Sequence, residues 1–184
     1  RGIDAVGLSG VDGGVIKAVR RPPKNVINKE TGEVKSIDYG NVGDIVEIDT
    51  HLLDLLLGGG YLPVISSLAA DDSGKVFNIN ADTIAAEIAV SLKAEKLILL
   101  SDVNGIYLDP NDETTKLDRL TTVDAFRMIK SGKASGGMIP KLQSLTSLLS
   151  RGVGSAHVIS GSERNALLAE VFTDEGTGTM IVAS

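Results

Sequence analysis

Short apolar runs alternate along the chain with longer stretches whose apolar residues recur at helical spacing. This order favours an α/β fold over an all-α or all-β fold. Strands are expected at the apolar runs 5–8, 15–19, 46–48, 61–67, 96–100, 156–160 and 179–182. Helices are expected at the amphipathic stretches 50–57, 82–94, 122–131, 138–150 and 165–172. We expect residues 1–184 to form a single α/β domain.

Several local features refine this expected fold. The run 96–100 (Lys-Leu-Ile-Leu-Leu) shows no alternation, which is typical of a parallel strand buried on both faces. The run 61–67 is also expected to be a buried strand, and the runs 5–8 and 15–19 are expected to pair across the glycine-rich turn between them. Residues 20–43 are polar and rich in turn residues, which predicts a surface hairpin. Asp82 is expected to cap the helix that follows it.

The composition limits the classes of function. A chain of 184 residues with 42% hydrophobic residues can bury a sizeable core. Its 24 acidic and 18 basic residues give a net charge of −6, which argues against a nucleic-acid partner. No apolar run has membrane-spanning length and no signal peptide opens the chain, so we expect a cytoplasmic protein without a membrane partner. Because there is no cysteine, the sequence excludes disulfides and thiolate metal sites.

The expected helix 138–150 begins in an unusual way. It follows a glycine-rich turn, has Pro140 in its first turn, where a missing amide costs nothing, and then places Lys141 near its amino end. A cation near the positive end of the helix macrodipole is mildly unfavourable. Free backbone amides and an ammonium group together indicate a bound anion, most simply a phosphate. The alternative is a solvated surface lysine, which is the commoner role of this residue type.

Two further segments carry candidate chemistry. Residues 101–105 (Ser-Asp-Val-Asn-Gly) follow an expected strand, and open α/β sheets bind ligands beyond the carboxyl ends of their strands. Residues 78–82 place Asn78, Asn80 and Asp82 before a helix, which is more polar side chains than capping requires. An ordinary loop and an ordinary cap are the alternatives. The chain contains no Gly-x-x-x-x-Gly-Lys-Ser/Thr loop, no Gly-x-Ser-x-Gly elbow and no His-Glu-x-x-His motif.

Taken in order, six runs resemble the acetylglutamate kinases of the amino-acid kinase family. They are residues 5–10, 60–65, 78–82, 95–105, 136–141 and 172–181, and together they span nearly the whole chain. The resemblance implies a three-layer α/β/α sandwich with a mostly parallel central sheet. It also implies that the chain is the C-terminal two-thirds of such a kinase, with its nucleotide-binding half. Because the chain begins with Arg1 in mid-pattern, we expect an N-terminal part to be missing.

The resemblance implies a function as well. Members transfer the γ-phosphoryl group of ATP, with Mg²⁺, to the side-chain carboxylate of N-acetyl-L-glutamate in arginine biosynthesis. They act in the cytoplasm, or in the plastid stroma of photosynthetic eukaryotes. They assemble as homo-oligomers, either dimers or hexamers built from dimers.

Site residues follow from the same resemblance, position by position. Lys141 matches the lysine that stabilises charge on the transferring phosphoryl group, and Asp82 the aspartate that positions the catalytic lysines. Asn78 and Asn80 match the substrate pocket, and no residue is assigned as a metal ligand. The positions that match nucleotide-binding regions are Asp102, Val103, Asn104, Gly105, Ile106, Tyr107, Lys133, Ala134, Ser135 and Met138.

The chain also departs from the family pattern. A second catalytic lysine, a second Gly-Gly turn and a substrate-binding arginine would all lie upstream of Ala5, so we expect the 184-residue chain to bind nucleotide but to be a poor kinase. Asn165 stands where arginine-inhibited members tend to carry a histidine, which leaves an arginine site open. Two other functions also remain open: a sister kinase acting on an acyl-aminoadipate, and a non-catalytic nucleotide-binding regulatory module.

Overall fold

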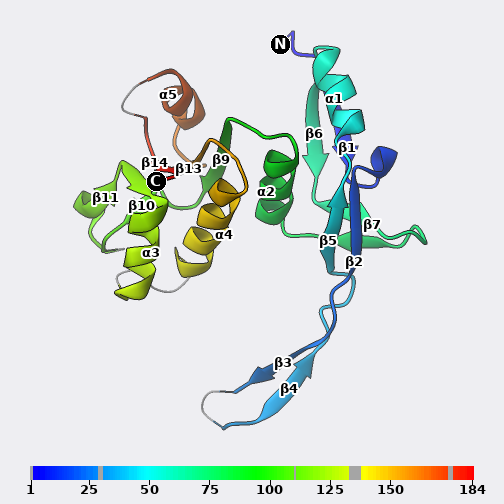
Figure 1. Cartoon of the computed structure of the whole chain (residues 1–184), viewed down its shortest axis with the longest axis horizontal. Coiled ribbons are helices and arrows are strands. Elements are labelled where there is room, and N and C mark those ends of the chain that lie inside the picture. The colour runs from blue at the N-terminus through cyan, green and yellow to red at the C-terminus, as the bar shows by residue number, and fades with distance from the viewer. Residues whose placement is uncertain (1, 29–30, 110, 133–137, 174–175) are drawn as a thin grey trace. The chain divides into compact units, whose positions relative to one another are not determined.

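The computed structural model describes residues 2–28, 31–109, 111–132, 138–173 and 176–184 (Figure 1). The chain divides into two compact units, Arg1–Ile84 and Ala85–Ser184. The division falls within helix α2 (Ala81–Ser91). Helices and strands alternate along the described residues, which confirms the predicted α/β class.

The first unit contains a mixed four-stranded sheet with the order β5–β2–β7–β8. These strands are β5 (Gly43–Ile48), β2 (Ile16–Arg20), β7 (Leu68–Ala70) and β8 (Val76–Asn78). Only β2 and β7 pair in parallel; β2 with β5 and β7 with β8 are antiparallel. The unit also contains a parallel pair, β1 (Ala5–Ser9) with β6 (Leu62–Ser66), and helix α1 (His51–Gly58), which packs against β6.

The pairing of β1 differs from the prediction that it would join the run 15–19. A 3-10 turn, η1 (Asp12–Gly14), follows β1, and its Gly13 and Gly14 have φ values of 61° and 69°, a region open to glycine. After this turn β2 enters the other sheet, where it pairs with β5 and β7. The prediction was wrong because a glycine-rich turn between two apolar runs resembles a hairpin, whereas the actual partner of β1 lies far along the chain.

The predicted strand at residues 61–67 is present as β6, but the prediction that it is buried was wrong. Exposed and half-buried positions alternate along β6, and Leu62 and Val64 are 50% and 55% exposed. A short apolar run gives no indication of which faces are covered, because coverage depends on elements packed from elsewhere in the chain.

The polar stretch 20–43 contains an antiparallel hairpin, β3 (Lys24–Ile27) with β4 (Val34–Ile37). Figure 1 shows this hairpin projecting away from β2 and β5, and all but one of its strand residues are exposed. Two ion pairs hold the chain at its base, Arg20 with Asp38 at 2.7 Å and Arg21 with Asp44 at 2.6 Å.

The second unit is built on a sheet with the order β12–β14–β13–β9. Its strands are β12 (Arg119–Thr121), β14 (Thr179–Val182), β13 (Ser155–Ser160) and β9 (Lys96–Ser101). The pairs β12–β14 and β13–β9 are parallel, and β13–β14 is antiparallel. A small antiparallel pair, β10 (Ile106–Tyr107) with β11 (Lys116–Leu117), and a 3-10 turn, η2 (Glu113–Thr115), lie between β9 and β12.

Helices cover both faces of this sheet, as a three-layer arrangement requires. Helix α4 (Met138–Ser150) packs on one face, beside α3 (Thr122–Lys130), and α5 (Ala166–Phe172) packs against β13 from the other face (Figure 1). The predicted apolar face of α4 is confirmed by four leucines that are at most 4% exposed: Leu142, Leu145, Leu148 and Leu149. They share a core with Ala156 and Val158 of β13.

The prediction that the strand at residues 96–100 is buried on both faces was wrong. Among the described strands β9 pairs only with β13, so it forms the edge of this sheet. Leu97 and Leu99 pack into the core, but Leu100, on the opposite face, is 59% exposed. The apolar run in the sequence shows the strand correctly but cannot show its place in the sheet.

Asn80, not Asp82, caps helix α2. The Asn80 side-chain oxygen accepts the Thr83 N–H at 3.0 Å, and its carbonyl oxygen accepts the Ile84 N–H at 3.1 Å, which is the N-cap pattern. Asp82 instead lies in the first turn, where a carboxylate interacts favourably with the helix dipole. The helix ends at Ser91, three residues before the predicted end.

In the second unit a salt bridge joins α2 to the end of α4. The Arg151 guanidinium donates two hydrogen bonds to the Glu87 carboxylate, at 2.6 and 2.8 Å. These bonds lower the pKa of the Glu87 carboxyl from its ordinary value of 4.5. Within the described residues, no helix combines the length and apolar content needed to cross a membrane.

We expect Arg151→Ala to destabilise the second unit by about 0.5–1 kcal/mol at pH 7, as for other partly exposed pairs. A carboxyl with a lowered pKa stabilises the folded state above its unfolded pKa and loses this contribution as pH falls through the folded value. The difference in the free energy of unfolding between Arg151→Ala and wild type should therefore become smaller below about pH 4. Urea unfolding at pH 7 and at pH 3.5 measures it.

The matched control is Arg127→Ala, because Arg127 makes one 3.2 Å contact with Asp124 and its side chain is 74% exposed. Arg127→Ala should change the free energy of unfolding by close to zero at both pH values. Equal losses for the two variants would contradict a specific role of the Glu87–Arg151 pair.

A second expected effect concerns Gly105, in the loop after β9. Gly105 has a φ of 112°, and a Cβ there would lie 2.6 Å from Thr179 Oγ1. That hydroxyl is already engaged, because it accepts the Ile106 N–H at 2.8 Å and donates to the Leu117 carbonyl oxygen. Gly105→Ala should therefore combine backbone strain with a clash against a fixed, buried atom.

Gly152→Ala separates these two effects, since Gly152 has a similar φ of 103° and open space where its Cβ would stand. We expect Gly105→Ala to lower the free energy of unfolding by about 2 kcal/mol more than Gly152→Ala does. Thermal unfolding of the two variants measures the difference. A similar loss in both would show that the contact with Thr179 is unimportant.

Candidate functional site

The parallel strands β9 and β13 end side by side in the second unit. Ser101 and Ser160, their last residues, stand opposite each other in the register, and the Gly161 N–H donates to the Ser101 carbonyl oxygen at 2.7 Å. Alternation places both serines on the face that carries Leu97, Leu99, Ala156 and Val158, which is the face that α4 covers. Ligands bind α/β sheets at such carboxyl ends.

Lys141 reaches this edge from the first turn of α4. Its ammonium group donates a 2.8 Å hydrogen bond to Ser101 Oγ and is partly buried. The structure thus brings together two segments that the sequence singled out, the loop after β9 and the start of the helix at 138. Among the described residues, Lys141 has no acidic partner within ion-pair distance. In this part of the structure, the positive charge of Lys141 is therefore not neutralised by a carboxylate.

The loop after Ser101 is held by backbone and side-chain contacts. Asp102 and Val103 are exposed, and the Tyr107 hydroxyl donates to the Asn104 carbonyl oxygen at 3.3 Å. The side-chain oxygen of Asn104 is buried and has no hydrogen-bond partner in the described part of the chain. A buried, unpaired acceptor is costly, so this oxygen calls for a donor that the described residues do not supply.

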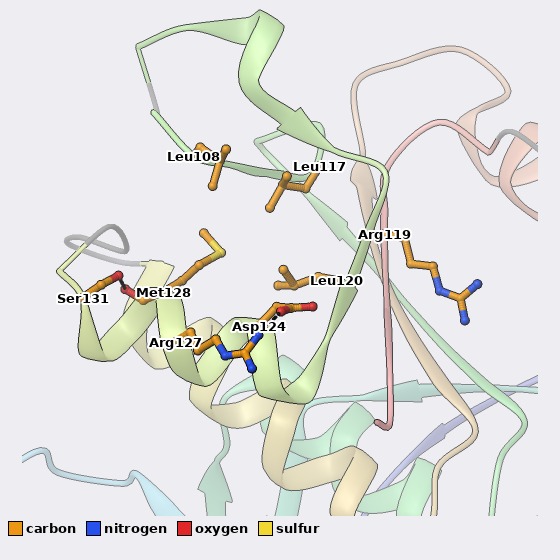
Figure 2. Close-up of a pocket in the computed structure, with 8 residues that line it drawn as sticks. All are labelled: Leu108, Leu117, Arg119, Leu120, Asp124, Arg127, Met128 and Ser131. Carbon is orange, nitrogen blue, oxygen red and sulfur yellow. Dashed lines mark hydrogen bonds and ion pairs between the residues drawn. The ribbon is translucent and has the colours of Figure 1, made fainter.

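A pocket of about 300 Å³ lies directly beyond this loop. Its apolar wall comes from three elements and a loop and consists of Leu108, Leu117, Leu120 and Met128. Figure 2 shows Leu108 and Leu117 facing Met128 and Leu120 across the pocket, while the Arg119 side chain points away. Asp124, Arg127 and Ser131 add polar groups at its α3 side. Such a mixed cavity suits a flat ring with a polar edge.

Sequence reasoning missed this pocket. Its leucines and methionine are scattered over residues 108–128, and only the β10–β11 pairing and the packing of α3 bring them together. The one available signal was the presence of Leu108, Leu117 and Leu120 in an otherwise polar stretch.

Three predicted site residues belong to the first unit. Asn78 ends β8 and donates its N–H to the Asn41 carbonyl oxygen at 2.8 Å. Asn80 and Asp82 follow at the start of α2, and all three side chains are exposed. Their assignment to a shared site with Lys141 stays a prediction. Lys133, Ala134 and Ser135 lie outside the described residues, and Met138 begins α4 and packs partly against the core.

A second polar cluster, which sequence reasoning also missed, lies on the α5 face of the sheet. His157 Nδ1 and Glu170 Oε1 are 2.6 Å apart, and both side chains are at most 5% exposed. The other Glu170 oxygen accepts the N–H groups of Thr177 and Gly178, at 2.7 and 3.1 Å. Burial raises the pKa of the Glu170 carboxyl, but these bonds and His157 outweigh it and lower the pKa overall.

This cluster resembles a hydrolytic triad, because Ser155 Oγ lies 2.9 Å from His157 Nε2. Ser155 is only 8% exposed, however, and it does not line the neighbouring pocket of about 420 Å³ that His157 and Glu170 border. A nucleophile must reach its substrate, so we interpret the cluster as the anchor of α5 and of the 176–178 turn. The arginine site left open by the sequence stays a prediction.

Comparisons with known proteins show which family the chain is similar to. The model of the amino acid kinase family matches residues 1–160. Acetylglutamate kinase of Methanocaldococcus jannaschii is 48% identical over 96% of this chain, and that of Symbiobacterium thermophilum is 46% identical over 99%. The chain spans only 58% and 60% of the length of these two relatives.

Solved structures show the same fold. N-acetylglutamate synthase from Neisseria gonorrhoeae, complexed with coenzyme A and L-arginine, superposes with a TM-score of 0.78. It is 28% identical, and the match covers 98% of this chain and 38% of that one. Isopentenyl phosphate kinase, at 22% identity and a TM-score of 0.63 over 98% of this chain and 60% of its own, shares the fold. The sequence and the fold agree, and the chain belongs to the amino acid kinase family.

Proposed function

We propose that this chain carries the nucleotide-binding half of an acetylglutamate kinase, placed in the C-terminal two-thirds of the complete enzyme. The observation that carries the proposal is Lys141, whose ammonium group stands at the carboxyl ends of β9 and β13 without a carboxylate partner in the described structure. The names of the relatives at 46–48% identity support the substrate. The proposed reaction phosphorylates the side-chain carboxylate of N-acetyl-L-glutamate, a step of arginine biosynthesis.

In this reaction the protein has mainly to position the two reactants and to stabilise the negative charge that develops. A carboxylate oxygen of the substrate attacks the γ-phosphorus of ATP, and the bond from that phosphorus to the β–γ bridging oxygen breaks. The bonding electrons leave with ADP, the product is an acyl phosphate, and no proton has to move. Negative charge spreads over the phosphoryl oxygens in the transition state, and an unpaired ammonium such as that of Lys141 stabilises it there.

The remaining residues take complementary roles in this proposal. The loop at residues 102–107, Met138 and the segment 133–135 would hold the nucleotide, with its base in the pocket beside Leu108 and Met128. Asn78 and Asn80 would contact the acetylated substrate, and Asp82 would orient the catalytic lysines. Asn80 is best placed to serve through its amide nitrogen, since its oxygen already accepts from the Thr83 N–H and the Thr83 hydroxyl.

Magnesium fits this arrangement as a partner of the nucleotide. Among the residues that the structure describes, no three acidic or histidine side chains converge as a metal cage would require. Mg²⁺ in kinases keeps several waters and binds the substrate phosphates, so it needs few protein ligands. When bound, it would neutralise charge on the phosphates beside Lys141. We also propose a homo-oligomeric enzyme that acts in the cytoplasm or in a plastid stroma.

Ligand coupling distinguishes this proposal from a purely regulatory nucleotide-binding module. Calorimetric titration of the 184-residue chain with MgADP should show binding, and its affinity should change when N-acetyl-L-glutamate is present, because phosphoryl transfer requires the two ligands to lie next to each other. Acyl-aminoadipate in place of N-acetyl-L-glutamate is the control for a sister kinase. Nucleotide binding that ignores both acids would support the regulatory module instead.

Lys141→Ala should reduce phosphoryl transfer about 10²–10³-fold while changing MgADP affinity far less, because its charge meets the transition state. Turnover is measured with ATP and N-acetyl-L-glutamate. Since we expect slow turnover, binding of MgADP with aluminium fluoride, which mimics the transferring phosphoryl group, gives a second measurement. Lys130→Ala, at an exposed lysine on α3, is the matched control. Unchanged turnover and unchanged analogue affinity would remove Lys141 from the mechanism.

A further inference from the structure

We propose that Ser101 is the positioning residue for Lys141, and that it fixes the ammonium group without neutralising it. The inference rests on the proposed function for its consequence in catalysis. The positioning of Lys141 itself does not depend on that function, because it concerns one hydrogen bond between the end of β9 and the first turn of α4.

The direction of this hydrogen bond is determined by the chemistry of the two groups. An ammonium can only donate, so the Ser101 oxygen must accept from Lys141 Nζ, at 2.8 Å. The Ser101 hydroxyl hydrogen is then free to point elsewhere, and the carboxylate of Asp102 lies 3.0 Å away as its acceptor. The order is therefore ammonium, hydroxyl, carboxylate. A hydroxyl that donates to a carboxylate becomes a better acceptor for the ammonium.

A neutral partner makes Lys141 different from the six lysines and arginines that form ion pairs in the described structure. Lys17, Arg20 and Arg151, for example, each meet a carboxylate directly, at 2.6–2.7 Å. Such a contact cancels most of the charge that a phosphate would otherwise attract. At Lys141 the hydroxyl stands between the ammonium and Asp102, so the side chain is oriented while its charge stays available.

Both ends of this contact are rigid. The Ser101 carbonyl oxygen accepts the Gly161 N–H at 2.7 Å, which fixes the end of β9 against the end of β13. On the other side, Leu142 directly follows Lys141 and is fully buried in the core. Placement within about 0.5 Å is what a charge-stabilising group needs, and flexible lysine side chains do not achieve it alone. Ser101 restricts the last rotatable bonds of Lys141.

The test measures the environment of Lys141 directly. The folded 184-residue chain is treated with a limiting amount of an amine-acylating reagent, and the labelling of Lys141 relative to Lys130 is measured by peptide mass spectrometry. Ser101→Ala should raise this ratio several-fold, because the freed amine is more accessible. Ser101→Thr, which keeps the hydroxyl, should restore the ratio, and Ser147→Ala, at an exposed serine on α4, should not change it.

The same variants test the catalytic consequence. Ser101→Ala should lower kcat about tenfold with little change in the KM for ATP, and Ser101→Thr should recover most of the loss. If wild type neither binds nucleotide nor transfers phosphate, the proposed function fails, whereas the labelling result still decides the position of Lys141. If labelling does not respond to Ser101→Ala, the positioning role is wrong whatever the activity.

A second variant covers the case in which Ser101→Ala does not fold. Asp102→Asn changes an exposed side chain and keeps the fold, but it weakens the acceptor that orients the Ser101 hydroxyl. Labelling of Lys141 should then rise about twofold. An unchanged ratio in Asp102→Asn would overturn the ordered chain from Lys141 through Ser101 to Asp102.

Discussion

The second unit depends on the packing of α4 against the sheet that β9 and β13 form. Four leucines of the helix bury their side chains over Ala156 and Val158, and this contact fixes the rotation of the helix about its own axis. Because Lys141 directly precedes Leu142, the rotation that buries the leucine also directs the lysine to the strand ends. Removing apolar surface from water is thus what positions a charged group at the candidate site.

The two faces of β13 carry different kinds of side chain. On the α4 side lie apolar residues and, at the strand end, Ser160, which stands opposite Ser101 of β9. On the α5 side lies the His157–Glu170 pair, in which every carboxylate oxygen has a partner. A buried charge is tolerated there because the hydrogen bonds are complete. The ammonium group of Lys141 differs from this pair, because it is positioned by a neutral hydroxyl and meets no carboxylate in the described structure. Its positive charge is therefore available to bind an anion.

Much of the fold could be predicted from the sequence, for reasons that individual elements illustrate. The extent of α4 was predicted correctly because its leucine spacing, Pro140 and Gly152 are all local signals. β14 was predicted with the same bounds for a similar reason. The partner of β1, the edge position of β9 and the exposure of β6 were predicted wrongly, because each depends on elements distant in the chain. The cap of α2 was misplaced by two residues, since Asn80 and Asp82 are equally good caps in sequence.

The sequence by itself determined the α/β class, the helix that presents Lys141, the strand that leads to Ser101 and the resemblance to a kinase family. These follow from local periodicity and from residues that lie close together in the chain. Only the tertiary structure decided that Lys141 meets a hydroxyl rather than a carboxylate, that Leu108 and Met128 line one pocket, and that His157 pairs with Glu170. Each of these contacts joins residues on different segments of the fold, 13 to 40 positions apart in the chain. Such contacts are fixed by the packing of helices on a sheet.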